Sequence, residues 1–210
     1  MRLLRRSRRS WRQGSFGVVD FEATGLDLIR DHVVSYGFVP IEDGRACMAG
    51  ALYRVVRPPV PVPAESIRVH GIRPGDLTAA PLLDDVGTEL IDALEGRTLV
   101  AYAAEIEVAF LDRLCRQLGR PRPRSTIDVL ALAAADSELG PPRSSGLANL
   151  AERYGVPVAR THHALGDALT TAQLFLVLAT RLEVRGKGSL PDLRRAGRSQ
   201  FARSLCSDTS

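Results

Sequence analysis

Residues 15–25 read SFGVVDFEATG, and this stretch decides both the fold and the chemistry expected of the chain. The apolar, β-rich run that ends at Glu22 is typical of a buried strand, and Ala23-Thr24-Gly25 is typical of a turn. Because residues i and i+2 of a strand point to the same face, Asp20 and Glu22 share one face. Two neighbouring carboxylates on a buried strand need a cation or a shared proton. The alternative is that the strand ends there and both side chains face water.

A second polar group lies at the start of a long helix expected over residues 163–184. His162 and His163 precede this helix, and Asp167 follows one turn inside it among small and apolar neighbours. Histidines at a helix start are commonly caps or surface residues. Combined with the carboxylates of the first strand, however, Asp167 completes a set of oxygen ligands of the kind that Mg²⁺ or Mn²⁺ prefers.

The order of the elements predicts an α/β domain. Three strands are followed by helix, strand, helix, strand and further helices, which gives a mixed five-stranded sheet with helices on both faces. The proline-rich segment of residues 58–77 is expected to follow an extended path around the core. We expect a disordered basic arm over residues 1–14, one domain over 15–185 and a flexible tail over 186–210.

Composition excludes several classes of protein. No apolar run approaches the ~18–20 residues of a membrane span, and the basic start lacks the apolar stretch of a secretion signal. We therefore expect a cytoplasmic protein without a membrane partner. The three cysteines (Cys47, Cys115 and Cys206) show no paired spacing, which argues against a disulfide framework or a zinc site.

The charge of the chain is unevenly distributed. Residues 1–12 carry six arginines and no acidic residue, whereas residues 13–180 contain more acidic than basic residues. The basic ends are explained equally well by contacts with nucleic-acid phosphates and by solvated arms without a partner.

Five segments, in this order along the chain, resemble the DEDDh 3′→5′ exonucleases, the family that includes the proofreading epsilon subunit of bacterial DNA polymerase III. The resemblance covers residues 16–183, and its segments are DFEATGL, VHGI, TLVAY with the later AFL, TIDVL and HHALGDA. It implies an RNase H-like sheet with the first strand in the middle. It also implies four metal-binding acids and a histidine base.

The resemblance assigns roles to individual residues. Asp20, Glu22 and Asp167 match metal-binding acids, and His162, five residues before Asp167, matches the general base better than His163. Residues that match positions in contact with the terminal nucleotide are Thr24, Gly25, Leu26 and His70. The alternative for His70 is a loop residue packed against Pro74.

The middle motif departs from the family pattern. The family shows His-Asn-Ala-x-Phe-Asp-x-x-Phe-Leu, whereas residues 102–111 read YAAEIEVAFL. Phe110-Leu111 fix the register, so Glu107 stands in the place of the aspartate, and Glu105 is the ligand if the register is wrong. Leu26 and Phe110 are candidate wedges against the terminal base, although Phe110 fits a core position equally well.

The resulting hypothesis is hydrolysis of terminal phosphodiesters with two Mg²⁺ or Mn²⁺ ions, releasing nucleoside 5′-monophosphates from single-stranded or frayed 3′ ends of DNA. Asp20, Glu22, Glu107 and Asp167 would hold the ions, and His162 would take the proton of the attacking water. The alternatives are an exoribonuclease acting on short RNA or RNA 3′ ends, and a nuclease fold that has lost activity and serves as a binding or scaffold module. A polymerase partner or a homodimer cannot be read from the sequence.

Overall fold

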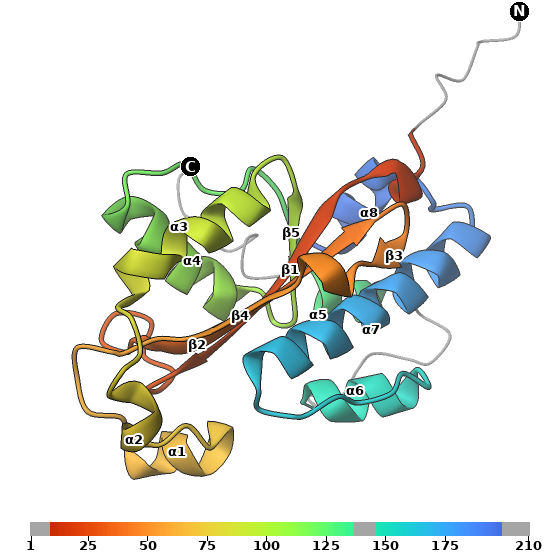
Figure 1. Ribbon diagram of the computed structural model, residues 1–210. Helices are drawn as coiled ribbons and strands as arrows, with labels where there is room; N and C mark the ends of the chain where they lie inside the picture. Colours follow the sequence, from red (N-terminus) through yellow and green to blue (C-terminus); the bar gives the residue numbers. More distant parts are fainter. Residues whose placement is uncertain (1–8, 137–145, 199–210) are drawn as a thin grey trace, which may run out of the picture.

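A computed structural model of the chain describes residues 9–136 and 146–198, and its centre is one mixed sheet (Figure 1). The strands, in chain order, are β1 (Phe16–Ala23), β2 (Val33–Glu42), β3 (Arg45–Ala46), β4 (Leu52–Val55), β5 (Thr98–Ala101) and β6 (Thr126–Asp128). Their order is β3-β2-β1-β5-β6, and β4 also pairs with β2. β1 is antiparallel to β2 and parallel to β5, so the first strand lies in the middle, as the resemblance implied.

The predicted fold class is confirmed, with one addition to the sheet. Five strands were expected, and the described residues form a sixth, the two-residue β3. This short strand forms because Asp43 (φ 50°) and Gly44 (φ 70°) make a tight hairpin turn after β2.

Helices cover both faces of the sheet. The long helix α7 (Ala164–Val184) crosses one face, together with α5 (Val129–Ala135), α6 (Leu147–Arg153) and α8 (Leu190–Ala196). The other face is covered by α3 (Leu83–Leu94) and α4 (Glu105–Gln117). Side chains of β1 alternate between the two cores: Phe16 and Val18 pack on the α7 side, and Val19 and Phe21 pack on the α3–α4 side. The same alternation places Asp20 and Glu22 on the α7 side.

The proline-rich segment after β4 differs from the prediction. Instead of staying extended it forms two short helices, α1 (Ala64–His70) and α2 (Pro74–Leu77). The prolines stand where a helix tolerates them: Pro63 directly before α1, and Pro74 at the first position of α2. Gly71, with φ 75°, ends α1.

The predicted domain boundaries are too narrow. Trp11 is fully buried and packs against Phe16 and Phe175, and Ser10 forms a β-bridge with Ser189. The helix α8 follows within the predicted tail. Residues 9–14 and 186–198 therefore belong to the folded domain, whereas residues 1–8 and 199–210 of the expected arm and tail lie outside the described residues. None of the helices in the described ranges combines the length and apolar character of a membrane span.

Candidate active site

Three of the predicted residues meet where β1 ends against the start of α7. One carboxylate oxygen each of Glu22 and Asp167 and one ring nitrogen of His162 lie within 4.8 Å of one another. Glu22 is 9% exposed, and Asp20, two residues earlier on the same face, is partly buried. The alternative that both acids of β1 face water is therefore excluded.

Two glycines allow α7 to reach the sheet. Gly37 of β2 pairs with Asp20, and a Cβ atom there would overlap the backbone of Ala164 and Leu165. A Cβ atom on Gly166 would overlap the carbonyl oxygen of Arg160 in the loop before α7. The absence of these two side chains brings Asp167 to the face that carries Asp20.

Glu107 completes the group from α4. It is 6% exposed, and its Oε2 atom has no hydrogen-bond partner among the described residues. Glu105, the alternative ligand, is more exposed than Glu107, so the register set by Phe110-Leu111 is the one that buries a carboxylate.

The four carboxylates (Asp20, Glu22, Glu107 and Asp167) form what we call the acidic cluster, and burial is the main cause that raises the pKa of each. Burial, and then the charges of Glu107, Asp167 and Glu22, raise the pKa of Asp20 well above its usual range. Burial raises the pKa of Glu22 to about 7 and that of Glu107 to about 8, and it also raises the pKa of Asp167. No arginine or lysine in the described ranges forms an ion pair with the cluster.

Such a cluster fits divalent cations. Buried carboxylates without a cationic partner must take up protons or bind metal, and hard oxygen donors gathered from three elements suit Mg²⁺ or Mn²⁺. The orphaned Oε2 atom of Glu107 is an unused donor of this kind.

The two histidines before α7 have different environments. His163 caps the helix by accepting a hydrogen bond from the Gly166 N–H, and its ring stacks on Tyr53 at 4.3 Å between centroids. His162 is exposed, adopts a positive φ of 52°, and donates its backbone N–H to Asp167 Oδ2 at 2.9 Å. Of the two, His162 is therefore the one whose ring is not given to capping the helix or stacking on Tyr53.

The turn after β1 is held rigidly. The Thr24 hydroxyl donates to Asp31 at 2.7 Å, and the other Asp31 oxygen accepts from the Asp27 N–H at 2.7 Å. A side chain on Gly25 would displace the Asp31 carboxylate, and with it the hydrogen bonds that brace the turn. Leu26 and Ile29 stand out from this turn, 78% and 88% exposed.

The remaining two predicted residues are both buried. His70 is 5% exposed; its Nδ1 accepts from the Ile72 N–H at 3.0 Å, and its Nε2 has no partner among the described residues. Burial, and then the charge of His162, lower the pKa of His70. Phe110 is 2% exposed and packs on Phe21, so its prediction as a wedge is wrong and the core alternative holds.

Sequence reasoning missed Asp128, which ends β6 and caps α5. Its carboxylate accepts from the Leu130 N–H at 2.8 Å and from the backbone of Ala103 and Ala104. Asp128 therefore fixes the turn from which α4, and with it Glu107, begins. Its position before a helix in TIDVL is an N-cap signal that could have identified it.

A family model described as Exonuclease (RNase_T) matches residues 18–175. The chain belongs to this exonuclease family. The exonuclease is 33% identical over 191 residues to a "DNA polymerase III subunit epsilon-like protein" of Rhodobacter capsulatus, covering 88% of this chain and 27% of the relative. It is 25% identical to the "DNA polymerase III subunit epsilon" of Aquifex aeolicus, covering 90% of this chain and 92% of the relative.

Solved structures share the fold of the exonuclease. Exonuclease X in complex with 5′ overhanging duplex DNA matches with a TM-score of 0.67 and 19% identity, covering 87% of this chain and 99% of that one. The nuclease domain of 3′hExo, a DEDDh family member bound to rAMP, matches with a TM-score of 0.65 and 18% identity, covering 83% and 94%. The predicted family and RNase H-like fold are confirmed. The chain spans about a quarter of the Rhodobacter relative and 13% of the PolC-type relatives.

Proposed function

We propose that this exonuclease domain removes nucleotides from the 3′ end of DNA by metal-dependent hydrolysis. The observation that carries the proposal is the acidic cluster, four carboxylates from three elements with no cationic side chain paired to them in the described chain. A binding module that had lost activity has no need to maintain such a cluster, because it costs stability whenever its members are ionised.

Asp20, Glu22, Glu107 and Asp167 would hold the divalent cations. When bound, Mg²⁺ or Mn²⁺ would supply the positive charge that stabilises the attacking and leaving oxygens of the scissile phosphate. Glu107 brings one methylene more than the aspartate usual in this family, and its burial at the cluster supports a role as ligand.

His162 would act as the general base. A ring nitrogen within 4.8 Å of the Glu22 and Asp167 oxygens can take the proton of a water molecule bound between them. The water oxygen would then bond to phosphorus as the bond from phosphorus to the 3′ oxygen of the preceding nucleotide breaks. That oxygen would take up a proton from solvent to become the new 3′-hydroxyl of the strand, and a nucleoside 5′-monophosphate would leave. The hydrogen bond from the His162 backbone to Asp167 fixes this side of the site.

The turn after β1 supports a preference for unpaired ends. Leu26 and Ile29 project from a turn braced by Thr24 and Asp31, and an apolar tip on a rigid turn separates a terminal base from its partner or stacks on it. The unpartnered Nε2 atom of His70 is a buried polar group available to the terminal nucleotide.

Digestion of end-labelled substrates tests the proposal. Single-stranded DNA, the same sequence as RNA, and a blunt duplex are incubated with Mg²⁺, Mn²⁺ or EDTA, each labelled at the 5′ or at the 3′ end. We expect 5′-labelled DNA to shorten in steps, 3′-labelled DNA to release labelled mononucleotide at once, and the duplex to be cut more slowly. Faster cleavage of RNA would assign the domain to exoribonucleases, and no cleavage of any substrate would mark a nuclease fold without activity.

A further inference from the structure

A cavity of about 700 Å³ lies at the end of the sheet opposite the acidic cluster. It is lined by residues 94–97, which lead into β5, and by residues 120–125, which lead into β6. Both strands run from this cavity toward the cluster. Phe16 of β1 pairs with Thr98 at the cavity end, and Glu22 lies six residue steps further along the strand, or roughly 20 Å away. The cavity is thus distinct from the candidate active site.

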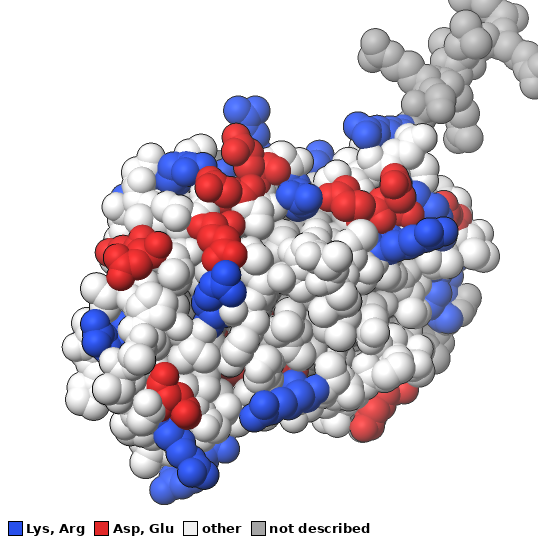
Figure 2. Space-filling view, in the orientation of Figure 1, with Lys and Arg blue, Asp and Glu red and all other residues white. Residues whose placement is uncertain are grey.

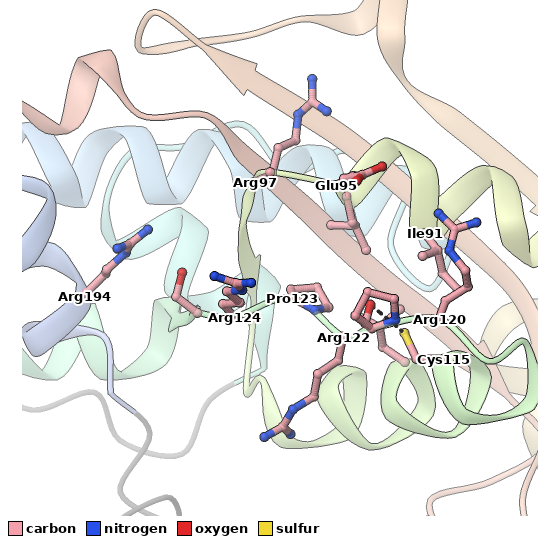
Figure 3. A pocket seen from close by; sticks show the side chains of 14 residues that line it. Ile91, Glu95, Arg97, Cys115, Arg120, Arg122, Pro123, Arg124 and Arg194 are labelled. Carbon is pink, nitrogen blue, oxygen red and sulfur yellow. Dashed lines mark hydrogen bonds between the residues drawn. The ribbon is translucent and has the colours of Figure 1, made fainter.

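Five arginines line this cavity, and they fall into two groups (Figure 3). Three are neutralised by acidic neighbours, in the pairs Arg97–Glu42, Arg120–Asp92 and Arg122–Asp112. The other two, Arg124 and Arg194, form no ion pair with a residue that the structure describes, and Figure 3 shows both on the side of the cavity away from Arg120. The positive charge available to a ligand is therefore concentrated at one end of the cavity.

The hydroxyl groups of Thr98 and Ser125 lie at the same end of the cavity, and one of them binds Arg194. The buried Thr98 Oγ1 accepts a hydrogen bond from Arg194 at 2.9 Å and one from the Ser125 hydroxyl at 3.2 Å. One nitrogen of Arg194 is thereby fixed, and the remaining N–H groups of Arg194 and Arg124 are available to a ligand. Guanidinium groups in such an arrangement suit a phosphate, whose oxygens they bind in pairs.

The other end of the cavity is apolar. Its wall is formed by aliphatic, proline and thiol side chains: Ile91, Leu94, Leu111, Cys115, Pro121 and Pro123. Glu95 also lines the cavity, and Figure 3 places it beside Arg97, away from Arg194. The volume lies within the roughly 300–1,000 Å³ of small-molecule sites. A cationic end joined to an apolar wall matches a ligand that has a phosphate at one end and a flat, weakly polar ring system at the other.

We propose that this cavity binds a nucleotide unit, with its phosphate at Arg124 and Arg194 and its base along the apolar wall. The unit is either a free mononucleotide or one residue of a bound strand, because both present the same phosphate and base. The proposal does not depend on the acidic cluster being catalytic.

Binding measured without metal separates the cavity from the active site. The full chain carrying Asp20→Asn is titrated in an isothermal calorimeter at low salt with EDTA present. The probes are deoxyadenosine 5′-monophosphate, a short oligodeoxyadenylate and inorganic phosphate. The same titrations are repeated after Arg124→Ala with Arg194→Ala, and after Arg116→Ala, which removes an exposed arginine of α4 outside the cavity.

We expect a nucleotide probe to bind, the double variant to weaken binding at least tenfold, and Arg116→Ala to leave it unchanged. Binding of the mononucleotide identifies a free ligand, and binding of the oligonucleotide alone identifies a unit within a strand. The proposal is overturned if no nucleotide probe binds, if Arg116→Ala weakens binding equally, or if phosphate binds as tightly as the nucleotide. Melting curves check folding, and Arg124→Ala alone serves if the double variant does not fold.

Discussion

Gly37 of β2 lies directly beneath Ala164, the first residue of α7, and the two are so close that the strand has no room for a Cβ atom. Gly37 also pairs with Asp20 across the sheet. One backbone position therefore sets the distance between the strand that carries Asp20 and the helix that carries Asp167.

Gly37→Ala should damage both stability and activity. The added methyl group must push the start of α7 off the sheet, at a cost of about 1–3 kcal/mol in the free energy of unfolding, as is usual for overpacking. Urea denaturation and the rate of DNA digestion measure the two effects. Gly75→Ala is the matched control, because a Cβ atom there meets nothing within 4 Å. Equal behaviour of the two variants would contradict the close packing of α7 on β2.

Glu107→Gln should reduce activity at least tenfold, which corresponds to about 1.4 kcal/mol of transition-state stabilisation. The amide keeps the size of the side chain but removes the charge that a divalent cation needs. Glu105→Gln, two residues earlier in the same helical turn, should leave the rate close to that of the wild type. Initial rates at several Mg²⁺ concentrations make the comparison, and the reverse ranking would show that Glu105 is the ligand.

The metal-free protein should lose stability as pH rises. Raised carboxyl pKa values mean that the folded state binds protons more tightly than the unfolded chain, so the free energy of unfolding falls with pH. The loss begins above the ordinary pKa near 4.5 and continues through the folded values of about 7 for Glu22 and about 8 for Glu107. For Glu22 alone it amounts to about 3 kcal/mol, since one pKa unit is worth about 1.4 kcal/mol.

Melting temperatures measured in EDTA and in Mn²⁺ from pH 5 to pH 8 test this pH dependence. Mn²⁺ should stabilise the protein more at pH 8 than at pH 5, because it binds the ionised carboxylates. Asp20→Asn should raise the melting temperature of the metal-free protein at pH 8 and reduce the gain from Mn²⁺. Asp43→Asn, at an exposed turn, should do neither. A metal-free protein equally stable across this range would contradict the crowding of ionised carboxylates.

Ala103→Gly should stabilise the fold by about 1 kcal/mol. Ala103 stands where the family usually has asparagine, and its φ of 48° is a left-handed conformation that costs alanine about 1–2 kcal/mol. In the interior of α4, Ala109→Gly should instead destabilise by roughly 1 kcal/mol, the usual cost of glycine in a helix. The midpoints of urea denaturation distinguish the two substitutions. A change in stability of the same sign in both variants would refute the strain at Ala103.

Much of this arrangement could be predicted from the sequence, because periodicity and short motifs are local. The buried strand with Asp20 and Glu22, the long helix after His163 and the register that selects Glu107 needed only nearby residues. The burial of Trp11 and the pairing of Ser10 with Ser189 could not be predicted, since they join the two ends of the chain. The importance of Gly37 was also hidden, because it depends on α7 more than a hundred residues later.

Surface charge contributed less to the prediction than motifs did. Figure 2 shows acidic and basic side chains interspersed on the face it presents, without one continuous basic track over the described residues. The excess of positive charge in the sequence therefore did not identify the site, which is acidic. The spacing of the motifs identified the acidic cluster, because the positions of metal ligands along the sequence are more restricted than the positions of surface charges.

The most direct test of the central claim is a time course on 5′-labelled single-stranded DNA in Mg²⁺, comparing the wild type with Asp20→Asn and Asp43→Asn. A ladder that shortens from the 3′ end for the wild type and Asp43→Asn, and that is absent for Asp20→Asn and in EDTA, is the predicted result. Cleavage that persists in Asp20→Asn, or that proceeds equally in EDTA, would contradict hydrolysis by metal ions held in the acidic cluster.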